Sequence, residues 1–543
     1  MITTANLAEH NLLTNALHDV QGIGSKETAS VDAAAQSNHI DDIDIDIVNN
    51  GKEELKGPLP MERFLTEKEH NIIAKLMMEF PDLKRIRQNV DIYSKNCVDR
   101  NYGGHADFPA EIARLGKESQ LVAADIAELS KKIKELEREI ATANASQKSP
   151  TSSSQRSAIA IEEAATLRDA LGELESRKAS YDATAHELAL ALPNLTNSET
   201  PLKGGPQLIS YIGHEPGQVA PSKSHTSHVD IGTSLSILDF NSATLSTGWG
   251  FYFLINEGAL LEQALVQYAL SMVLRQGWTA VAPPSVVYSY IADACGFQPR
   301  DQNDEQQIWQ IQQAEKDALK PKRSLAATAE IPLAAMYAGK DIPEDRLPLK
   351  LVGSSRCYRA EAGARGVDTK GLYRVHEFTK VEMFAWTNSM DDSQDTERSM
   401  PVFNEMLRIQ REILSSLGLP CRILEMPSSE LGASAVRKVD IEVLFPSRMS
   451  RDEGWGEVTS LSICTDYQSR RLGTRILQKS GKRAKFPHTV NGTAMAVPRV
   501  LAAILEHGWR EEEQCVIIPE VLRPYMGGQD KIQRARRDKQ FYS

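Results

Sequence analysis

Two long heptad runs constrain the fold of this chain more than any other feature of its sequence. Apolar residues recur in each run at alternating spacings of three and four, which is the pattern of a coiled-coil seam. A polar linker containing Pro150 separates the runs and cannot continue either helix. The seam positions are Leu115, Ser119, Val122, Ile126, Leu129, Ile133, Leu136 and Ile140, then Ala164, Leu167, Leu171, Leu174, Lys178, Tyr181, Ala185 and Leu188.

Two runs of similar length joined by a short turn predict an antiparallel helical hairpin over about 112–190. Such a hairpin is compatible with a dimerisation element, with a spacer, or with a protruding arm that reaches a macromolecular partner through exposed cations. Those cations are Lys131, Lys132, Lys134, Arg138, Arg168, Arg177 and Lys178.

Charge separates an acidic N-terminal segment from a nearly neutral body. Residues 1–57 contain three lysines, no arginine and ten acidic residues, a charge of −7 within the −11 of the whole 543-residue chain. The segment lacks sustained apolar periodicity, so we predict that it is disordered. Its lack of arginine is atypical of a mitochondrial presequence. The nearly neutral body remains compatible with a local basic face that binds a nucleic-acid backbone.

The other segments divide the chain further. Residues 85–100 are predicted to form one helix, and Pro193 ends the second heptad helix before a linker rich in proline, glycine and serine. A helix over 259–276 and a strand over 278–282 fit either a subunit interface or an ordinary helix–strand unit. We find no apolar run of the ~18 residues that a membrane helix needs. Six scattered cysteines without a CxxC pair disfavour a disulfide framework and a zinc ribbon.

Residues 356–384 are the strongest candidate for a binding site. Their sequence, RCYRAEAGARGVDTKGLYRVHEFTKVEMF, predicts a strand, a glycine-rich loop and a returning strand whose alternation begins at Leu372. Several cations, aromatic residues and carboxylates such as Glu361 and Glu382 on one hairpin are poorly explained as packing, because buried charges require partners. A polyanionic ligand such as a nucleoside triphosphate would supply that partner.

Two further segments place carboxylates where they are suited to bind ligands. Thr328-Ala329-Glu330 precedes an apolar run, so Glu330 is a candidate partner for an ammonium group, although Thr328 also has the signature of a helix cap. An alternating strand with the polar residues Glu457 and Thr459, and Asp466 beyond them, is suited to holding Mg²⁺ between phosphates. A solvated edge strand would have the same pattern.

The last candidate segment is HTVNGTAMAVPR, residues 488–499. It places Asn491 and Thr493 in a turn before a helix that carries Arg499. An arginine at this position is suited to meeting a phosphate or stacking on a base, but a single surface arginine on a helix is unremarkable.

Over about 85–528 the chain resembles the seryl-tRNA synthetases, a family of class II aminoacyl-tRNA synthetases. The heptad hairpin stands where that family carries its tRNA-binding arm. The matching motifs are HVDIG and LDF (228–232 and 238–240), TAEIPL, the motif 2 segment RAEAGARGVDTKGLYRVHEFTKVEMF, and the motif 3 segment NGTAMAVPRVLAAILE followed by IPEVLRPYMGG.

The resemblance implies an α+β fold, in which an antiparallel sheet flanked by helices forms the catalytic domain and an antiparallel coiled coil forms an N-terminal arm. The implied order is an acidic extension (1–57), a tRNA-binding domain (58–193), a linker (194–224), a catalytic domain (225–530) and a basic tail (531–543). Motifs 1, 2 and 3 fall at about 258–285, 356–384 and 491–508.

The resemblance also implies a role for each matching residue. Arg359 and Arg499 are the implied catalytic residues. Arg359 would bridge the α-phosphate of ATP and the serine carboxylate. Phe378 and Arg499 would lie on either side of the adenine. Serine would be held by Thr328, Ala329, Glu330, Arg359, Glu382, Asn491 and Thr493. ATP would be held by Arg359, Ala360, Glu361, Val375, Phe378, Glu457, Val458, Thr459, Ser460 and Arg499, and Mg²⁺ by Glu457 and Ser460.

The implied activity is that of a serine–tRNA ligase, which uses L-serine, ATP with Mg²⁺, and tRNA(Ser). The resemblance also implies a homodimer that is not bound to a membrane. An inactive paralogue that binds RNA is the alternative. The chain departs from the family pattern at three positions. Lys370 stands where the family usually has arginine, Ala327 where it has proline or glycine, and Thr493 where it has serine. Its RQNVDIYSKNCVDRNY segment resembles fungal mitochondrial members, so we expect a mitochondrial location, with the cytoplasm as the alternative.

Overall fold

The computed structural model describes residues 81–145, 153–214, 226–297, 307–318, 320–361, 371–389, 396–483 and 485–534. These residues all belong to one compact unit. The predicted disordered segment 1–57, part of the predicted linker, Lys370 and the end of the predicted tail lie outside the described residues. Within the described ranges, no helix combines the length and the hydrophobicity needed to cross a membrane.

Two short helices, α3 (Leu83–Gln88) and α4 (Val90–Asp99), precede the arm. Asn89 separates them, with φ −135° and ψ 40°, and its side-chain amide donates to the carbonyl of Arg85 at 2.8 Å. A side chain that bonds to the backbone in this way competes with the helical hydrogen bonds. The prediction of a single helix over 85–100 is therefore wrong at Asn89.

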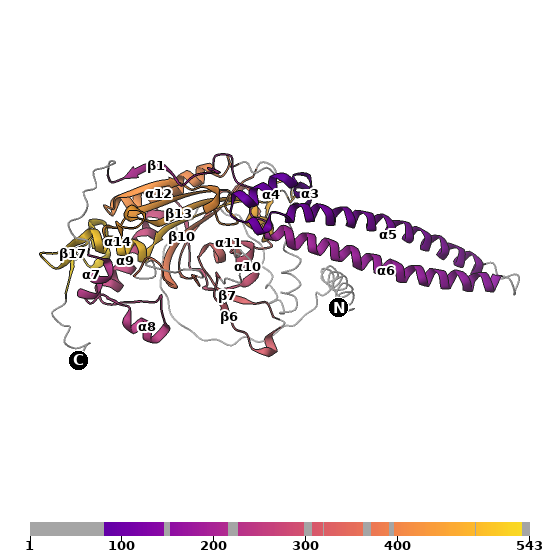
Figure 1. Ribbon diagram of the computed structural model, residues 1–543, viewed down its shortest axis with the longest axis horizontal. Helices are drawn as coiled ribbons and strands as arrows, with labels where there is room; N and C mark the ends of the chain where they lie inside the picture. The colour runs from indigo at the N-terminus through magenta and orange to yellow at the C-terminus, as the bar shows by residue number, and fades with distance from the viewer. Residues whose placement is uncertain are drawn as a thin grey trace, which may run out of the picture. The chain divides into compact units, whose positions relative to one another are not determined.

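The arm is a hairpin of two long antiparallel helices, α5 (Phe108–Ala145) and α6 (Ser153–Ala191) (Figure 1). All the predicted seam positions are buried or half-buried, which confirms the heptad assignment. Polar contacts also join the two helices: Ser119, itself a seam position, donates to Asp182 at 2.7 Å, and Arg168 pairs with Glu137 at 2.6 Å.

The segments that flank the arm, at Asn96, Arg100 and Asn194, are held by buried polar contacts as well as by apolar packing. Arg100 is fully buried and donates to the backbone carbonyls of Asn194 and Gly432. Asn96 also donates to the Asn194 carbonyl, at 3.0 Å, while the Asn194 amide donates to the carbonyl of Cys464 at 2.9 Å. Buried polar groups of this kind fix one arrangement, because breaking a contact leaves a donor unpaired.

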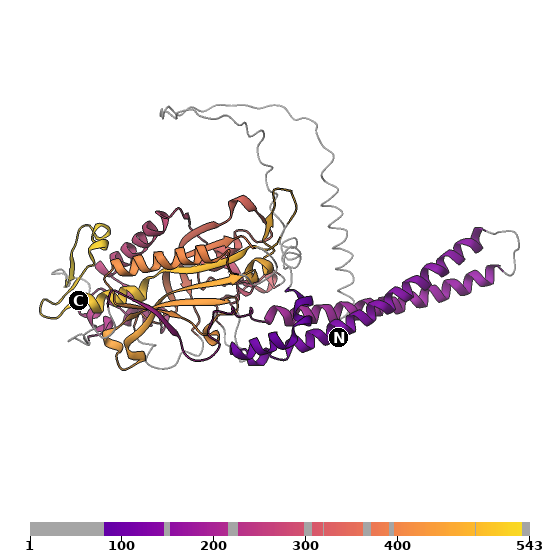
Figure 2. The same cartoon turned by 90° about the horizontal axis from the view of Figure 1, so that it is seen from above.

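An eight-stranded sheet forms the centre of the fold, in the order β1-β11-β12-β13-β15-β10-β9-β4 (Figure 2). Neighbouring strands are antiparallel except for β4 and β9, which are parallel. The strands are β1 (Gln207–Ile212), β4 (Thr279–Val281), β9 (Leu349–Tyr358), β10 (Glu377–Thr387), β11 (Cys421–Glu425), β12 (Arg437–Leu444), β13 (Trp455–Thr465) and β15 (His488–Ala496).

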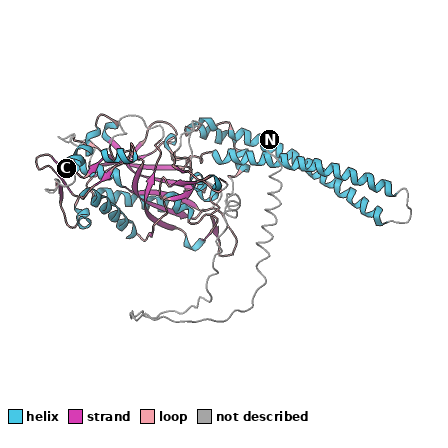
Figure 3. Cartoon of the chain, turned by 90° about the horizontal axis from the view of Figure 1, so that it is seen from below, coloured by secondary structure: helices cyan, strands magenta, loops and turns pink. Residues whose placement is uncertain are grey.

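Helices cover both faces of this sheet because the side chains of each strand alternate between the faces. On β10, Val381 and Met383 enter a core with α9 (Glu257–Leu274), α12 (Met400–Ser416) and α14 (Val497–Gly508). Phe384 and Trp386 enter a second core with α10 (Ser289–Ala294) and α11 (Glu330–Ala335). Figure 3 shows these helices packed around the strands. The predicted α+β fold with an antiparallel sheet flanked by helices is confirmed.

Shorter elements complete the described chain. They are α7 (His228–Ser234), β2 (Leu238–Asp239), α8 (Asn241–Thr247), β3 (Phe253–Leu254), β5 (Val286–Tyr288), β6 (Gln310–Ile311), β7 (Arg323–Leu325), β8 (Asp341–Pro343), α13 (Tyr467–Arg471), β14 (Arg475–Leu477), β16 (Trp509–Arg510), β17 (Cys515–Ile517) and β18 (Lys531–Gln533).

Candidate active site

A pocket of about 500 Å³ opens between β10, β13, β15 and the start of α14. Four cationic side chains and two carboxylates line it, so the pocket is suited to an anionic ligand. Of the predicted site residues, ten line it: Arg359, Glu361, Val375, Phe378, Glu457, Val458, Thr459, Ser460, Thr493 and Arg499. The other lining residues are Tyr373, Arg374, Lys380, Ala496 and Pro498.

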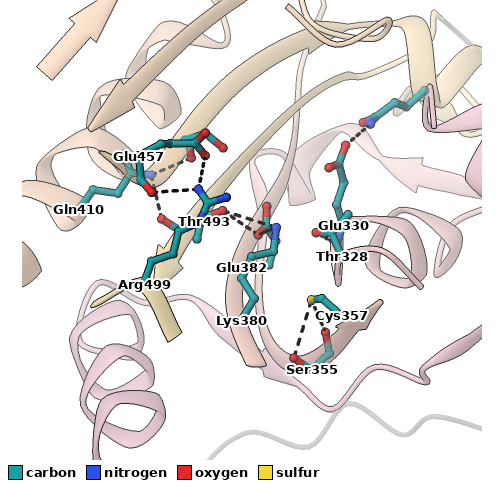
Figure 4. A network of polar contacts seen from close by, with 12 residues as sticks. Thr328, Glu330, Ser355, Cys357, Lys380, Glu382, Gln410, Glu457, Thr493 and Arg499 are labelled. Atoms are coloured by element: carbon teal, nitrogen blue, oxygen red, sulfur yellow. Dashed lines mark hydrogen bonds and ion pairs between the residues drawn. The ribbon is translucent and has the colours of Figure 1, made fainter. Parts of the chain in front are cut away.

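At one end of the pocket, three side chains from β10 and β15 form a buried group that we call the Glu382 cluster. The Lys380 ammonium lies 2.6 Å from the Glu382 carboxylate, and both side chains are less than a tenth exposed. Thr493 donates to Glu382 at 3.2 Å and accepts from Lys380 at 3.5 Å (Figure 4). Strand pairing explains the contact, because Thr493 lies directly opposite Glu382 across β10 and β15.

Glu330 is a second buried carboxylate near this cluster. It begins α11, and its carboxylate accepts from the Gln468 amide at 2.6 Å. Burial and then the charge of Glu382 raise the pKa of Glu330 to about 7, although Lys380, Gln468 and Asn491 oppose the shift. A carboxyl group poised near neutrality in a buried site is suited to receiving a cation.

The other residues predicted to bind serine lie around Glu330. The Thr328 hydroxyl accepts from the Glu330 backbone N–H at 3.2 Å, but the N-cap of α11 is Ala329, so the predicted cap, Thr328, lies one residue before the cap position. Ala329 is fully buried beside it. Asn491 makes a side-chain hydrogen bond with Glu330 and lies opposite Phe384 of β10. These residues, with Glu382 and Ala360, do not line the pocket itself.

The predicted hairpin of residues 356–384 is formed by β9 and β10, which pair antiparallel from Tyr358–Glu377 onward. The returning strand starts at Glu377, so the expected alternation from Leu372 is wrong over 372–376. One further backbone hydrogen bond extends the hairpin beyond the paired residues, because the Arg359 N–H donates to the His376 carbonyl at 2.9 Å.

Cations of the pocket stack on aromatic rings. The Arg359 guanidinium lies 5.3 Å from the centre of the Phe378 ring. Another arginine, Arg374, instead pairs with the Glu361 carboxylate at 3.3 Å. Arg499 lies 4.6 Å from the Tyr373 ring. Tyr373 had no predicted role, and its only signal in the sequence was its position two residues before Val375.

Glu457 and Arg499 meet at the other end of the pocket. Arg499 donates to the Glu457 carbonyl at 2.9 Å, and the Glu457 carboxylate lies 3.6 Å from the same guanidinium. Burial would raise the pKa of Glu457, but the positive charges of Lys438 and then Arg499 hold it below its ordinary value. Glu457 is therefore ionised at neutral pH.

The alternative that residues 457–460 form a solvated edge strand is wrong, because β13 lies between β12 and β15 in the middle of the sheet. A register shift in the pairing of β12 with β13, between Ile441 and Glu442, marks a β-bulge beside Glu457. Asp466 does not join this group. It precedes α13 and pairs with Arg470 at 2.6 Å.

His228, the first residue of the HVDIG motif, connects the loop before β10 to α14. Its Nε2 accepts from the Leu372 N–H at 3.0 Å, and its Nδ1 lies 2.8 Å from the Glu506 carboxylate. Gly371 has φ +91°, and a Cβ there would lie 2.3 Å from His228 Nε2. The contact therefore requires glycine at 371.

Comparisons with known proteins agree with this geometry. Residues 81–196 match the family model of the seryl-tRNA synthetase N-terminal domain, and residues 313–508 match that of the class II tRNA synthetase core domain (G, H, P, S and T). The mitochondrial serine–tRNA ligase of Saccharomyces cerevisiae is 39% identical over 457 residues, which cover 83% of this chain and 95% of that protein. The serine–tRNA ligase of Rhodopirellula baltica is 36% identical over 450 residues, 82% of this chain and 98% of that protein.

Solved structures give the same result. The seryl-tRNA synthetase of Pyrococcus horikoshii, complexed with ATP, superposes with a TM-score of 0.69 at 28% identity, over 84% of this chain and all of that one. The cytoplasmic serine–tRNA ligase of Naegleria fowleri, in complex with AMP, has the same TM-score at 25% identity, over 84% of this chain and 99% of that one. With its helical arm, its sheet and its pocket, the chain belongs to the seryl-tRNA synthetase family of class II aminoacyl-tRNA synthetases.

Proposed function

We propose that this chain ligates serine to tRNA and that its pocket first condenses serine with ATP. One observation carries the proposal: a single opening joins an arginine-rich side, with Arg359 and Arg499, to the buried Glu382 cluster. The first side suits a triphosphate and the second an amino acid. An inactive paralogue would be expected to lose these charged groups, and all of them are present.

Serine binds at the end of the pocket lined by Lys380 and Thr493, beside the two buried carboxylates. Glu330 and Glu382 face the ammonium group, and hydroxyls of Thr328 and Thr493 with the Asn491 amide supply further hydrogen bonds. A site built to bond a hydroxyl discriminates by roughly 10⁴ or more against an analogue without one, because its own polar groups would be left unpaired. Alanine should therefore be rejected without an editing step.

ATP binds on the arginine side, in agreement with the ATP and AMP bound to the two related structures. Arg359 is placed for the α-phosphate and the serine carboxylate, with Ala360 and Glu361 beside it. The adenine lies between Phe378 and Arg499, each of which lines the pocket, with Val375 next to them. To admit the base, Arg359 must leave the face of the Phe378 ring over which it now lies.

Mg²⁺ fits the same side of the pocket, next to Arg499, where Glu457 and Ser460 offer hard oxygen donors. Glu457 suits a divalent cation because neighbouring cations keep its carboxylate ionised. Phosphate oxygens of ATP would complete the coordination of the ion beside these two residues. When bound, the ion neutralises phosphate charge.

The first reaction joins two anions. A serine carboxylate oxygen attacks the α-phosphorus, a new P–O bond forms, and pyrophosphate leaves with the electron pair of the broken bond. In the second reaction the 3′-terminal ribose hydroxyl of tRNA takes the seryl group and AMP leaves. Arg359 and Arg499 reduce the repulsion between the anions and orient them, so positioning and electrostatics account for catalysis without a covalent protein intermediate.

The arm binds tRNA(Ser). Helices α5 and α6 together carry more acidic than basic residues, so contact with RNA must come from a local cluster. Lys131, Lys134 and Arg138 supply one, since spacings of three and four place these exposed side chains along one face of α5. Lys132, Arg168 and Lys178 instead pair with carboxylates of the arm.

The chain forms a homodimer through the region of motif 1 and the two elements, α8 and β3, that precede it. Large apolar side chains are exposed on three neighbouring elements there, and one of them, Leu245, is 89% exposed. Burial of such a group in a partner interface is favourable. The residues are Leu245 of α8, Phe253 of β3, and Leu260 and Leu274 of α9. Sedimentation equilibrium should give twice the mass of the chain.

A mitochondrial location follows from relatives that include the mitochondrial enzymes of two yeasts, 39% and 36% identical. Bacterial relatives match at similar identity, so the cytoplasm remains the alternative. Fractionation of cells expressing the full chain, followed by protease protection of the mitochondria, distinguishes the two compartments.

Exchange of pyrophosphate into ATP, driven in turn by serine, threonine, alanine and proline, tests the activity. Serine alone should support exchange, and tRNA(Ser) should then accept serine. If serine drives no exchange while another amino acid does, the chain is a different class II synthetase. If none does, the inactive paralogue is correct.

A further inference from the structure

Gln410 is a buried polar side chain on the apolar face of α12, and none of the roles above uses it. Its solvent exposure is 0%, and its Oε1 has no hydrogen-bond partner among the described residues. A buried amide with an unpaired oxygen is less favourable than an apolar side chain of the same size. Packing alone therefore does not explain this glutamine. Its neighbours on the buried face are Val402, Phe403, Met406, Ile409, Ile413 and Leu414.

The amide nitrogen of Gln410 joins two strands at the point where their pairing ends. Nε2 donates to the carbonyls of Ser460 on β13 and Thr493 on β15, at 2.9 Å in each case (Figure 4). The last pair between these strands on this side is Leu461 with Gly492. Both carbonyls thus lie one residue beyond the end of the ladder.

The pocket begins where these strands separate. On β13 its wall is formed by residues 457–460, and on β15 by Thr493 and Ala496. The first wall belongs to the nucleotide side and the second to the serine side. Through a single amide group, Gln410 therefore holds the two walls to one helix beneath them.

Gly492 allows α12 to lie this close to the sheet. A Cβ at this position would lie 3.0 Å from Leu461 Cδ1, 3.4 Å from Met406 Sδ and 3.5 Å from Gln410 Nε2. The first of these distances is tight, so the end of the Leu461 side chain on β13 would have to shift by a few tenths of an ångström, while the two α12 atoms would come into van der Waals contact with the added Cβ. The glycine therefore leaves β15 in close contact with both β13 and α12.

We propose that Gln410 is a positioning residue that sets the distance between the serine-binding strand and the phosphate-binding strand. The proposal rests on the function proposed above for the pocket. Gln410 contacts neither substrate. It holds the backbone of Thr493, whose hydroxyl reaches Glu382, and the backbone of Ser460, a candidate Mg²⁺ ligand.

This distance matters for the reaction because the serine carboxylate must approach the α-phosphorus in line with the leaving group. A displacement of about 1 Å between bound reactants reduces the rate by roughly 10²-fold, while each reactant still binds its own wall. Loss of the Gln410 bonds should therefore lower kcat much more than it raises either KM.

Gln410→Leu removes both donors and suits the apolar face of α12, but it takes the Gln410 donor from the carbonyls of Ser460 and Thr493, so the variant should fold with a Tm equal to or modestly below that of the parent. Gln410→Met is the substitute if leucine misfolds. In serine-dependent pyrophosphate exchange we expect kcat to fall by about 10- to 100-fold, with KM for serine and for ATP within about threefold of the parent. Gln410→Glu keeps the length but loses the donors, and it should be at least as impaired.

Ile413→Val is the matched control, because it perturbs the same buried face of α12 without removing a hydrogen bond to either strand. It should retain the kcat of the parent. A kcat within threefold of the parent in Gln410→Leu, or an equal loss in Ile413→Val, would overturn the inference.

Hydrogen exchange of the full chain separates this inference from the proposed activity. In Gln410→Leu, amides of residues 456–461 and 492–497 should exchange at least tenfold faster than in the parent, whereas Ile413→Val should leave them unchanged. If exchange at these amides is unaltered, Gln410 does not hold the strands, whatever reaction the pocket performs. If the parent drives no serine-dependent pyrophosphate exchange but the amides respond, only the proposed function fails.

Discussion

Serine should bind more tightly as the pH rises from 6 to 8, because Glu330 must lose a proton before it can face an ammonium group. Burial and the neighbouring Glu382 raise the pKa of Glu330 to about 7, and Lys380 and Gln468 oppose that shift only in part. With this pKa, about a tenth of Glu330 is ionised at pH 6, half at pH 7 and nine-tenths at pH 8. If only the ionised form binds serine, KM for serine should fall about tenfold over this range.

Calorimetry provides a direct measurement. Titration of serine in two buffers of different ionisation enthalpy gives the number of protons released, which should be about one-half at pH 7 and close to zero at pH 8. Glu330→Gln should bind serine weakly with no pH dependence, and KM for ATP should not change with pH in the same way. Proton release of zero at pH 7, or an unchanged pH dependence in Glu330→Gln, would refute the reasoning.

The same pKa has a consequence for stability, with a defined sign. A carboxyl group whose pKa is raised by folding binds its proton more tightly in the folded state, so the contribution of Glu330 to stability is greatest below pH 4.5 and falls as the pH rises towards 7. The difference of about 2.5 pKa units corresponds to about 3 kcal/mol at most. Thermal unfolding of Glu330→Gln should therefore show a smaller loss of Tm between pH 5 and pH 8 than the parent does.

Three further perturbations test the assignment of roles. Arg359→Ala should lower the rate of pyrophosphate exchange at least about 10²-fold. The control Arg356→Ala changes an arginine outside the pocket and should have little effect on this rate. Equal losses in the two variants would contradict the role of Arg359. Deletion of 120–177, which rejoins the arm near its Ser119–Asp182 contact, should spare exchange and abolish aminoacylation; loss of both would mean that the arm also supports the catalytic site. Lys380→Met leaves Glu382 buried without its cation, so the free energy of unfolding measured with denaturant should fall by about 3–5 kcal/mol. The double variant that adds Glu382→Gln should recover stability but not activity. A single variant as stable as the parent would contradict the pairing.

Local patterns accounted for the parts of the structure that depend on neighbouring residues. The arm was predictable because a coiled-coil seam is a property of residue spacing within each helix, and all its seam positions are buried or half-buried. The β9–β10 hairpin was predictable for the same reason, apart from its start at Glu377. The break at Asn89 was missed because a single side-chain bond to the backbone decided it.

Sequence by itself determined the family and the kinds of group in the pocket, since the motifs place arginines, carboxylates and hydroxyls in a recognisable order. Only the tertiary structure decided which of these groups touch. Lys380 reaches Thr493, Gln468 reaches Glu330, and Gln410 reaches Ser460, each across a separation of fifty residues or more. Strand order and helix packing bring these partners together, and the burial that results sets the charge of Glu330. No spacing along the chain encodes such contacts, because they depend on which strands lie side by side in the folded sheet.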